Sequence, residues 1–240
     1  MQDSLYVALS SQVALERRLN TIADNVANAN TVGFRATQIK FEDVLMGRGS
    51  EATSYVSTGG TYLSEAKGGF RQTGNPMDFA IRGDAWFAID TPAGQVMTRD
   101  GRFTMLQTGQ VVSIEGYPVL DAAGTAIQLD PAAGDPFVSP DGFIRQNGQQ
   151  AGAFGLFTFE PGENFTRFGN SGVIADGTQA AVVDTRDAGV QQGFVEDSNV
   201  NPVLEMTRLI MVQRAFESAS SAIRQTEQTY SEAVKTLGGR

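Results

Sequence analysis

Apolar residues in the last part of the chain recur at alternating steps of three and four from Leu209 to Leu237, with Thr226 as the one polar member. Such a heptad stripe predicts a long helix whose apolar side is narrow enough for a coiled coil. Asn201 and Pro202 predict the start of this helix, because Asn can accept a hydrogen bond from the free first-turn amides and Pro has no N–H to lose. The stripe consists of Leu209, Val212, Phe216, Ala219, Ile223, Thr226, Tyr230, Ala233 and Leu237.

A second pattern of the same kind lies at the opposite end of the chain, at Leu15, Leu19, Ile22 and Val26. No Pro or Gly interrupts residues 1–32, which favours one continuous helix. We expect the two helices to pair, because each stripe is too long to be buried within its own helix. The alternative is that each helix is an ordinary amphipathic helix on a globular core, whose apolar face is usually wider. The residues expected to face the N-terminal stripe are Phe216, Ile223, Tyr230 and Leu237.

Between residues 69 and 196 the apolar period changes to two. Short runs rich in β-branched and aromatic residues alternate with turn residues, which predicts an all-β domain, either a barrel or a sandwich. Asp-Gly dipeptides at 100–101, 141–142 and 176–177 predict hairpin turns between such runs. The expected strands cover residues 79–81, 86–89, 96–98, 103–105, 111–114, 119–120, 127–129, 143–145, 154–159, 181–183 and 193–195.

The expected fold class is therefore α+β with several domains. Residues 1–32 and 200–240 are expected to form a helical coiled-coil domain, and residues 76–199 an all-β domain inserted between them. Residues 33–75 are expected to be a partly extended connecting segment.

Within this connecting segment, Phe41, Val44 and Leu45 are expected to close a short helix. The stretch of residues 47–60 is rich in Gly, Ser and Thr, so we expect it to be a flexible loop.

Composition removes most enzyme classes. The 240 residues contain neither Cys nor His, which excludes thiol catalysis, disulfides, Cys/His zinc sites and Ser-His-Asp triads. A pair of carboxylates acting on a glycoside is the remaining catalytic alternative, with Asp78, Asp84, Asp90 and Asp100 near the ends of expected strands. No spacing marks two of them as partners, and Asp is common in turns for local reasons. We expect no enzyme activity, no catalytic residue, no cofactor, no metal site and no small-molecule substrate.

The distribution of charge excludes nucleic acid as a partner. The net charge is −9, and residues 1–32 and 202–240 together sum to zero, so the middle of the chain carries the whole excess. A nucleic-acid binder needs a basic face, and the sequence shows none. No apolar run is long enough for a membrane span, and the N-terminus lacks the pattern of a cleaved signal peptide.

Five sequence blocks resemble the bacterial flagellar axial proteins, the rod and hook family. Residues 25–34 read Asn-Val-Ala-Asn-Ala-Asn-Thr-Val-Gly-Phe, similar to the family signature N-L-A-N-x-N-T-x-G-F. Residues 73–87 resemble its T-G-N-x-L-D-x-A-I-x-G-x-G-F-F block, and residues 98–103 its T-R-x-G-x-F element. Residues 198–201 and 213–217 resemble its S-N-V-N and Q-R-A-Y-E elements. The resemblance covers essentially the whole chain in the family's order.

The resemblance also marks motif positions where the chain leaves the first helix and where it enters the β domain. We expect these residues to shape the two turns. They are Asn25, Asn28, Asn30, Thr31, Gly33, Phe34, Thr73, Gly74, Asn75, Asp78 and Gly83.

The resemblance implies a structural subunit of the flagellar basal-body rod that polymerises helically and transmits motor torque across the periplasm. It implies that the terminal helices form an inner layer and the β domain an outer one. The length and the opening residues 6–10 resemble the proximal rod members most. A distal rod protein and, more remotely, a secreted adhesin or tail-like protein are the alternatives.

The implied partners are copies of the same chain, other flagellar rod proteins and the flagellar type III export apparatus. The implied location is the basal-body rod in the periplasmic space, reached by export without a cleaved signal peptide.

Overall fold

The computed structural model describes residues 2–46, 53–175, 180–181 and 188–238. It divides the chain into two compact units. The helical unit comprises Met1–Ala27, Thr37–Tyr62 and Asn201–Arg240, and the β unit comprises Asn28–Ala36 and Leu63–Val200. The expected connecting segment is thereby shared between the two units, because its first and last parts belong to the β unit and its middle to the helical unit.

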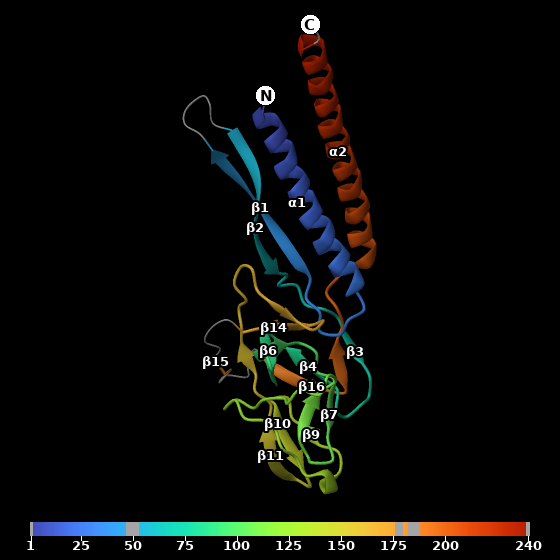
Figure 1. The fold of residues 1–240 in the computed structure, drawn as a ribbon. Coiled ribbons are helices and arrows are strands. Elements are labelled where there is room, and N and C mark those ends of the chain that lie inside the picture. The colour runs from blue at the N-terminus through green and yellow to red at the C-terminus, as the bar shows by residue number, and fades with distance from the viewer. Residues whose placement is uncertain (1, 47–52, 176–179, 182–187, 239–240) are drawn as a thin grey trace. The chain divides into compact units, whose positions relative to one another are not determined.

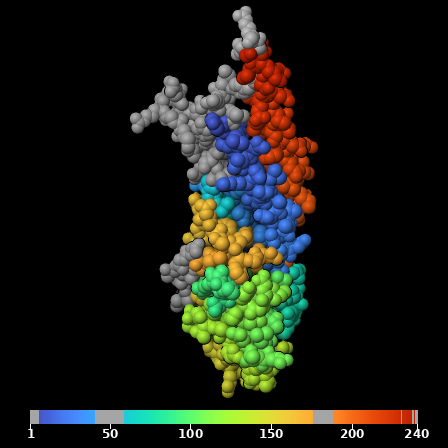
Figure 2. All heavy atoms as spheres, viewed as in Figure 1, coloured from blue at the N-terminus to red at the C-terminus, as the bar shows by residue number. Residues whose placement is uncertain are grey.

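Two long helices, α1 (Gln2–Ala27) and α2 (Pro202–Gly238), lie side by side and antiparallel in the helical unit (Figures 1 and 2). α1 has 26 residues and α2 has 37, and Figure 1 shows α2 continuing past the N-terminal end of α1. The predicted start of α2 is confirmed, since the Asn201 side chain accepts the backbone amide of Leu204 at 3.1 Å.

A two-stranded sheet of β1 (Thr37–Met46) and β2 (Thr53–Leu63) completes the helical unit. The short helix predicted at residues 41–45 is therefore wrong, and so is the part of the predicted 47–60 loop that β2 occupies. Apolar and charged residues alternate along the middle of β1, and β2 begins with Thr, Ser, Tyr and Val, of which Thr, Tyr and Val favour an extended backbone. Residues 47–52 lie outside the described residues.

The β unit consists of several small antiparallel sheets. The largest has six strands in the order β13-β14-β6-β5-β12-β15, a second has the order β11-β10-β9, and three sheets have two strands each, β16-β4, β17-β3 and β7-β8. A 3-10 turn, η2, covers Pro131–Ala133. The strands are β3 (Phe70–Gln72), β4 (Phe79–Arg82), β5 (Ala85–Thr91), β6 (Gly94–Thr98), β7 (Phe103–Met105), β8 (Val111–Ser113), β9 (Phe137–Val138), β10 (Phe143–Gln146), β11 (Gln149–Ala153), β12 (Phe157–Thr158), β13 (Arg167–Phe168), β14 (Gly172–Ile174), β15 (Ala180–Ala181), β16 (Gly189–Gln192) and β17 (Phe194–Glu196).

The mixed helix and sheet content agrees with the expected class, but the strands do not close into a barrel within the described residues. Closure needs a continuous hydrogen-bonded ladder with a constant stagger. The strands of the β unit other than β5 have only two to five residues, and the predicted strands at 119–120 and 127–129 form only isolated bridges. Short strands leave the sheets open at their edges, and side-chain packing joins them instead.

The three Asp-Gly dipeptides were predicted to form hairpin turns, and the structure differs among them. Asp141-Gly142 joins β9 to β10, which pair antiparallel, so this predicted hairpin is confirmed. Asp100-Gly101 joins β6 to β7, which belong to different sheets, so a hairpin there is wrong. A side chain at Gly101 would lie 1.8 Å from the carbonyl oxygen of Phe79, so the glycine serves a close crossing of two segments rather than a turn. Asp176-Gly177 lies outside the described residues.

Aromatic side chains form the centre of the β unit. Phe79, Phe87, Phe103 and Phe154 are each at most 5% exposed, and their rings contact one another at centroid distances of 4.8 to 6.0 Å. These residues come from β4, β5, β7 and the segment before β12. The cluster therefore joins sheets that share no hydrogen-bonded ladder. Trp86, the only tryptophan, is buried in a neighbouring apolar cluster, as expected of a core residue.

We expect Phe87→Ala to lower the free energy of unfolding of the β unit by about 3 to 5 kcal/mol, because it opens a cavity where the rings meet. Phe137→Ala is the matched control, since the Phe137 side chain is 62% exposed. It should change the same quantity by at most about 0.5 kcal/mol. Urea unfolding followed by Trp86 fluorescence measures both, and equal effects of the two substitutions would contradict the role of the cluster.

Candidate assembly interface

Exposure along α2 follows the heptad pattern of the sequence from Leu209 to Thr226, whereas Ala233, a predicted stripe member beyond this range, is exposed. Between Leu209 and Thr226 every stripe position is buried or half-buried, and all other positions except Ser220 are exposed. Val212 is the most buried, at 6% exposure. The side chains of Tyr230 and Leu237 lie outside the described part, so their predicted place in the stripe is untested. The half-buried stripe members are Leu209, Phe216, Ala219, Ile223 and Thr226.

The N-terminal stripe lies on the buried side of α1. Ile22 is 5% exposed, and Leu15, Leu19 and Val26 are half-buried. The polar side chain of Gln12 lies between the helices and donates a hydrogen bond to the Ser220 hydroxyl at 3.2 Å. The predicted pairing thus has direct side-chain contact in the isolated chain, while its coiled-coil packing remains a proposal.

Large apolar side chains also remain exposed on both helices. On α2, Val203, Met206 and Ile210 follow one another at steps of three and four, so they form a second stripe that α1 does not cover. Exposed apolar residues are ordinary when scattered, but a continuous patch indicates a contact with another molecule. The exposed members are Tyr6, Leu9 and Val13 on α1 and Val203, Leu204, Met206, Ile210, Met211 and Val234 on α2.

A buried cluster of three charged residues lies where the sequence motifs meet in the β unit. Glu196 is 1% exposed, and its two carboxylate oxygens contact different arginines. Arg35 Nη2 lies 2.7 Å from Oε1, while Arg99 Nε and Nη2 lie 2.8 and 2.7 Å from Oε2. The amide of Gly68 also donates to Oε1, at 3.2 Å. We call Arg35, Arg99 and Glu196 the charged junction.

The backbone supplies most of the remaining hydrogen bonds of the two guanidinium groups. Arg99 donates to the carbonyls of Ile81 and Gly83, each at 3.1 Å, and to that of Ala85. Arg35 donates to the carbonyl of Glu65 at 3.2 Å and to that of Ala66. Burial lowers the pKa of the Arg35 guanidinium below its usual value, and the Glu196 carboxylate opposes this shift. The junction therefore joins several segments of the β unit at once.

The glycine of the first motif is required by this geometry. Gly33 has a φ of +70°, and its amide donates to the carbonyl of Glu196 at 2.7 Å. A side chain at this position would lie 2.3 Å from the backbone nitrogen of Asp100. Only glycine allows the first motif to pass between residues 99–100 and β17.

The other residues of the first motif make local contacts. In the helical unit, the Asn25 amide exchanges two hydrogen bonds of 2.9 Å with the backbone of Thr37, which closes the intervening loop. In the β unit, Asn28 accepts from both the amide and the hydroxyl of Thr31 at 3.1 Å. Phe34 is 2% exposed, and the Arg167 guanidinium lies 4.4 Å from its ring centre. Asn30 is exposed.

The second motif forms the turn that leads into β4. The Thr73 and Gly74 amides donate to the carbonyl of Gly193 at 2.8 and 3.1 Å, and Gly74 has a φ of +74°. The Asn75 side chain donates to the Asp78 carboxylate at 3.0 Å. Gly83, with a φ of +86°, presents the carbonyl that accepts from Arg99. The two predicted motifs therefore reach the same junction.

The carboxylates of the catalytic alternative do not converge. Asp78 contacts Asn75, Asp84 pairs with Lys67 at 2.7 Å, and Asp100 pairs with Arg102. Hydrogen bonding to Lys67 lowers the pKa of the Asp84 carboxyl, which is the effect of an exposed ion pair rather than of a catalytic acid. No group of acidic residues in the described part is arranged to hold a metal ion.

Sequence reasoning missed the charged junction. Glu196 stands beside Val195 in a buried strand, and Arg35 directly follows the first motif. A charged residue in an otherwise apolar strand was the available signal, but sequence spacing gives no indication that residues 35, 99 and 196 meet.

Comparison with known proteins relates these features to one family. Residues 5–35 match the model described as flagella basal body rod protein, residues 80–146 the flagellar hook protein FlgE/F/G D1 domain, and residues 191–236 the flagellar basal body rod FlgEFG protein C-terminal region. Each matched segment contributes one residue of the charged junction.

The chain belongs to the family of flagellar basal-body rod proteins, structural subunits of the flagellum. It is 65% identical over 240 residues to the flagellar basal-body rod protein FlgF of Mesorhizobium japonicum, with both chains covered completely. It is 53% identical over 239 residues to FlgF of Rhizobium meliloti, covering 100% of this chain and 99% of that protein. FlgG of Bacillus subtilis is 30% identical over 260 residues, with 98% of each chain covered. The family resemblance predicted from the motifs is confirmed, and it favours FlgF.

Among the described residues, no helix combines the length and the apolar character needed to cross a membrane.

We expect Glu196→Gln to lower the free energy of unfolding of the β unit by about 3 kcal/mol or more, because two buried guanidinium groups lose their counter-charge. Asp197→Asn is the matched control, since the adjacent Asp197 pairs with Arg71 in a half-exposed ion pair. It should cost at most about 1 kcal/mol. Urea unfolding followed by Trp86 fluorescence compares the two, and a similar loss in both variants would rule out a special role for the junction.

Proposed function

We propose that this chain is a structural subunit of the proximal flagellar rod, and that it assembles helically with copies of itself and with other rod proteins through α1 and α2. The observation that carries the proposal is the second apolar stripe of α2 at Val203, Met206 and Ile210, which the chain's own α1 leaves exposed. A monomer gains nothing from this stripe, whereas packing against a further helix would bury it.

The length of the helices supports the same assembly. At 1.5 Å per residue, α2 is about 55 Å long and extends beyond α1. A helix of this length obtains most of its stability from packing along its apolar side. In the proposed rod, helices from neighbouring copies complete this packing as a coiled coil, so the helical unit is stabilised by assembly.

The distribution of charge suits a layered assembly. Acidic and basic residues nearly balance in the helical unit, so the β unit carries almost the whole net charge of −9. Near-neutral surfaces associate without strong mutual repulsion, and a charged layer remains solvated. We therefore propose that the helical units form the inner layer of the rod and the β units the outer layer. A continuous inner layer of packed helices is suited to transmit torque.

The finer parts of the proposal concern export and position. We propose that the chain leaves the cell through the flagellar type III export apparatus without a cleaved signal peptide, and that the rod it forms lies in the periplasmic space. The proximal position is supported by the full-length match to FlgF at 65% identity, whereas the alignment with FlgG spreads over 260 positions at 30% identity. A distal rod position is the second candidate. Nothing in the structure favours an adhesin.

Electron microscopy of basal bodies tests the proposal. Basal bodies purified from a strain lacking this chain should stop at the inner membrane, with neither rod nor hook, and the complemented strain should recover both. Rods that end part-way would favour the distal position, and intact rods with normal hooks would refute a role in the rod.

We expect Ile223→Asp to block incorporation of the chain into the rod while the β unit stays folded, because a carboxylate in the half-buried stripe has no partner. Gln225→Asp introduces the same charge at an exposed position of α2 and should incorporate normally. Immunoblots of purified basal bodies measure incorporation, and Trp86 fluorescence of the purified chains reports the fold. Normal incorporation of Ile223→Asp would disprove the predicted stripe.

A further inference from the structure

The outer face of the three-stranded sheet in the β unit has unusual side chains for a solvated surface. Residues of β9 and β10 alternate strictly, with Val138, Ile144 and Gln146 buried against the core. The opposite face of an antiparallel sheet is normally polar. Here it carries Phe137 at 62% exposure and Phe143 at 39%.

An arginine neighbours both aromatic residues on this face of the sheet. Arg145 is directly opposite Phe137 in the β9–β10 pairing and two residues from Phe143 on the same strand face. Among the described residues Arg145 has no ion-pair partner, although Asp141 in the adjoining turn lies near enough to interact with its charge. We call Phe137, Phe143 and Arg145 the aromatic face. It places one positive charge beside two exposed aromatic residues, with the Asp141 carboxylate in the adjoining turn.

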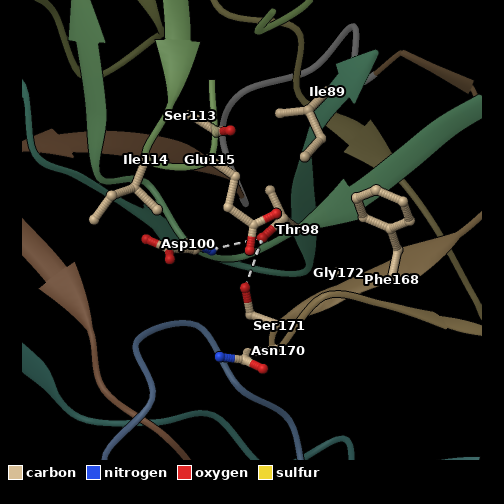
Figure 3. A pocket seen from close by; sticks show the side chains of 10 residues that line it. All are labelled: Ile89, Thr98, Asp100, Ser113, Ile114, Glu115, Phe168, Asn170, Ser171 and Gly172. Atoms are coloured by element: carbon tan, nitrogen blue, oxygen red, sulfur yellow. Dashed lines mark hydrogen bonds between the residues drawn. The ribbon is translucent and has the colours of Figure 1, made fainter. Parts of the chain in front are cut away.

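A small hollow elsewhere in the β unit carries the opposite charge. It lies beside the ends of β6, β8 and β13 and the start of β14, and its floor contains the hydroxyls of Thr98 and Ser171, which are 3.3 Å apart. Figure 3 shows the Glu115 carboxylate pointing into it, with Ile114 on one side and Phe168 on the other. We call it the Glu115 hollow. The remaining lining residues are Ile89, Asp100, Ser113, Asn170 and Gly172.

The Glu115 hollow offers one uncompensated negative charge. The Asp100 carboxylate is already bound by Arg102, with 2.6 Å between Oδ2 and Nη2. Glu115 is exposed and has no ion-pair partner among the described residues. Ile114, at the tip of the same turn, is 63% exposed, so the charge has an apolar rim. The hollow therefore suits a cation carried on an apolar surface.

The two surfaces lie at different ends of the β unit. Ile114 and Glu115 directly follow the C-terminal end of β8. At the opposite end of β8, the preceding turn is hydrogen-bonded to Leu129. The next residue, Asp130, donates its amide hydrogen to Gln146 of β10. Figure 1 agrees, since β6 and β14 lie at one end of this unit and β9 to β11 at the other. One chain cannot bring its own two surfaces together.

We propose that the aromatic face of one copy docks on the Glu115 hollow of a second copy, with the Arg145 guanidinium against the Glu115 carboxylate. The opposite charges, each beside an exposed apolar side chain, favour a second copy as the occupant. A contact between two different surfaces of the same chain is heterologous, and such contacts repeat along an open helical array when the rotation between copies does not close a ring. The contact rests on the proposed function, and it adds an outer-layer contact to the one made by the helices.

Charge exchange tests the pairing in assembled rods. Arg145→Glu and Glu115→Arg should each reduce the copies of this chain in purified basal bodies about tenfold, because each places like charges in the contact. The double variant, in which every copy carries both changes, should recover to within about twofold of the native chain. Arg82→Glu, an exposed change of the same kind on β4, is the control and should have no effect. Single variants that assemble normally, or a double variant that does not recover, would overturn the proposal.

A second measurement does not depend on rods, so failure of the proposed function can be distinguished from failure of the contact. The chain contains no cysteine, so introduced cysteines report only the designed contact. Purified Asn170→Cys and Gln150→Cys chains, mixed at high concentration and oxidised, should form a disulfide-linked heterodimer, because both positions border the proposed contact. Gln107→Cys mixed with Gln150→Cys is the exposed control. If Gln150→Cys forms a heterodimer with Asn170→Cys but not with Gln107→Cys, the contact is supported even if the chain is absent from basal bodies. If no heterodimer forms with Asn170→Cys, the contact is overturned even if rods are normal.

Discussion

One buried carboxylate organises the β unit. Glu196 is the common partner of two guanidinium groups that come from segments more than sixty residues apart in the sequence, and one of these guanidinium groups also binds the loop before β3. Removing charged groups from water costs several kcal/mol each, so such a cluster forms only where the surrounding backbone already provides hydrogen bonds. The carbonyls of β4, β5 and the segment before β3 do so here. Residues 28–36, which follow α1 in the sequence, and residues 197–200, which precede α2, are thereby held in the β unit.

The β unit and the helical unit are stabilised in different ways. The β unit has a compact aromatic core that joins several short sheets, so it is complete within one chain. The helical unit buries one stripe of α2 and leaves a second one exposed. In the proposed assembly, this second stripe would be buried only when neighbouring copies are present. The proposed contact between β units would add specificity, since charged contacts distinguish partners more than they strengthen binding.

Features that depend on residues close together in the sequence were predicted correctly. The start of α2 at Asn201, the hairpin at Asp141 and Gly142 and the strands β4, β5 and β7 follow from capping, turn chemistry and period two, which operate over a few residues. Three features were not predictable in this way. β2 lies in a polar stretch that predicted a loop. The Asp-Gly dipeptide at Gly101 predicted a hairpin, but it serves a close crossing of two segments. The barrel was inferred from the number of strands, and the strands do not close within the described part of the chain. In each case the outcome depends on which distant segment lies alongside.

The sequence by itself determined the two long helices, the β character of the middle and the family, because hydrophobic periodicity and motif order are properties of the chain alone. It also indicated Gly33 as special, though not the reason. Only the tertiary structure decided that Arg35, Arg99 and Glu196 form one junction, that Gly33 must pass the backbone of Asp100 and that Phe137 and Phe143 face solvent. These outcomes depend on contacts between residues far apart in the sequence, whose energies depend on burial and distance, and neither quantity can be obtained from residue order.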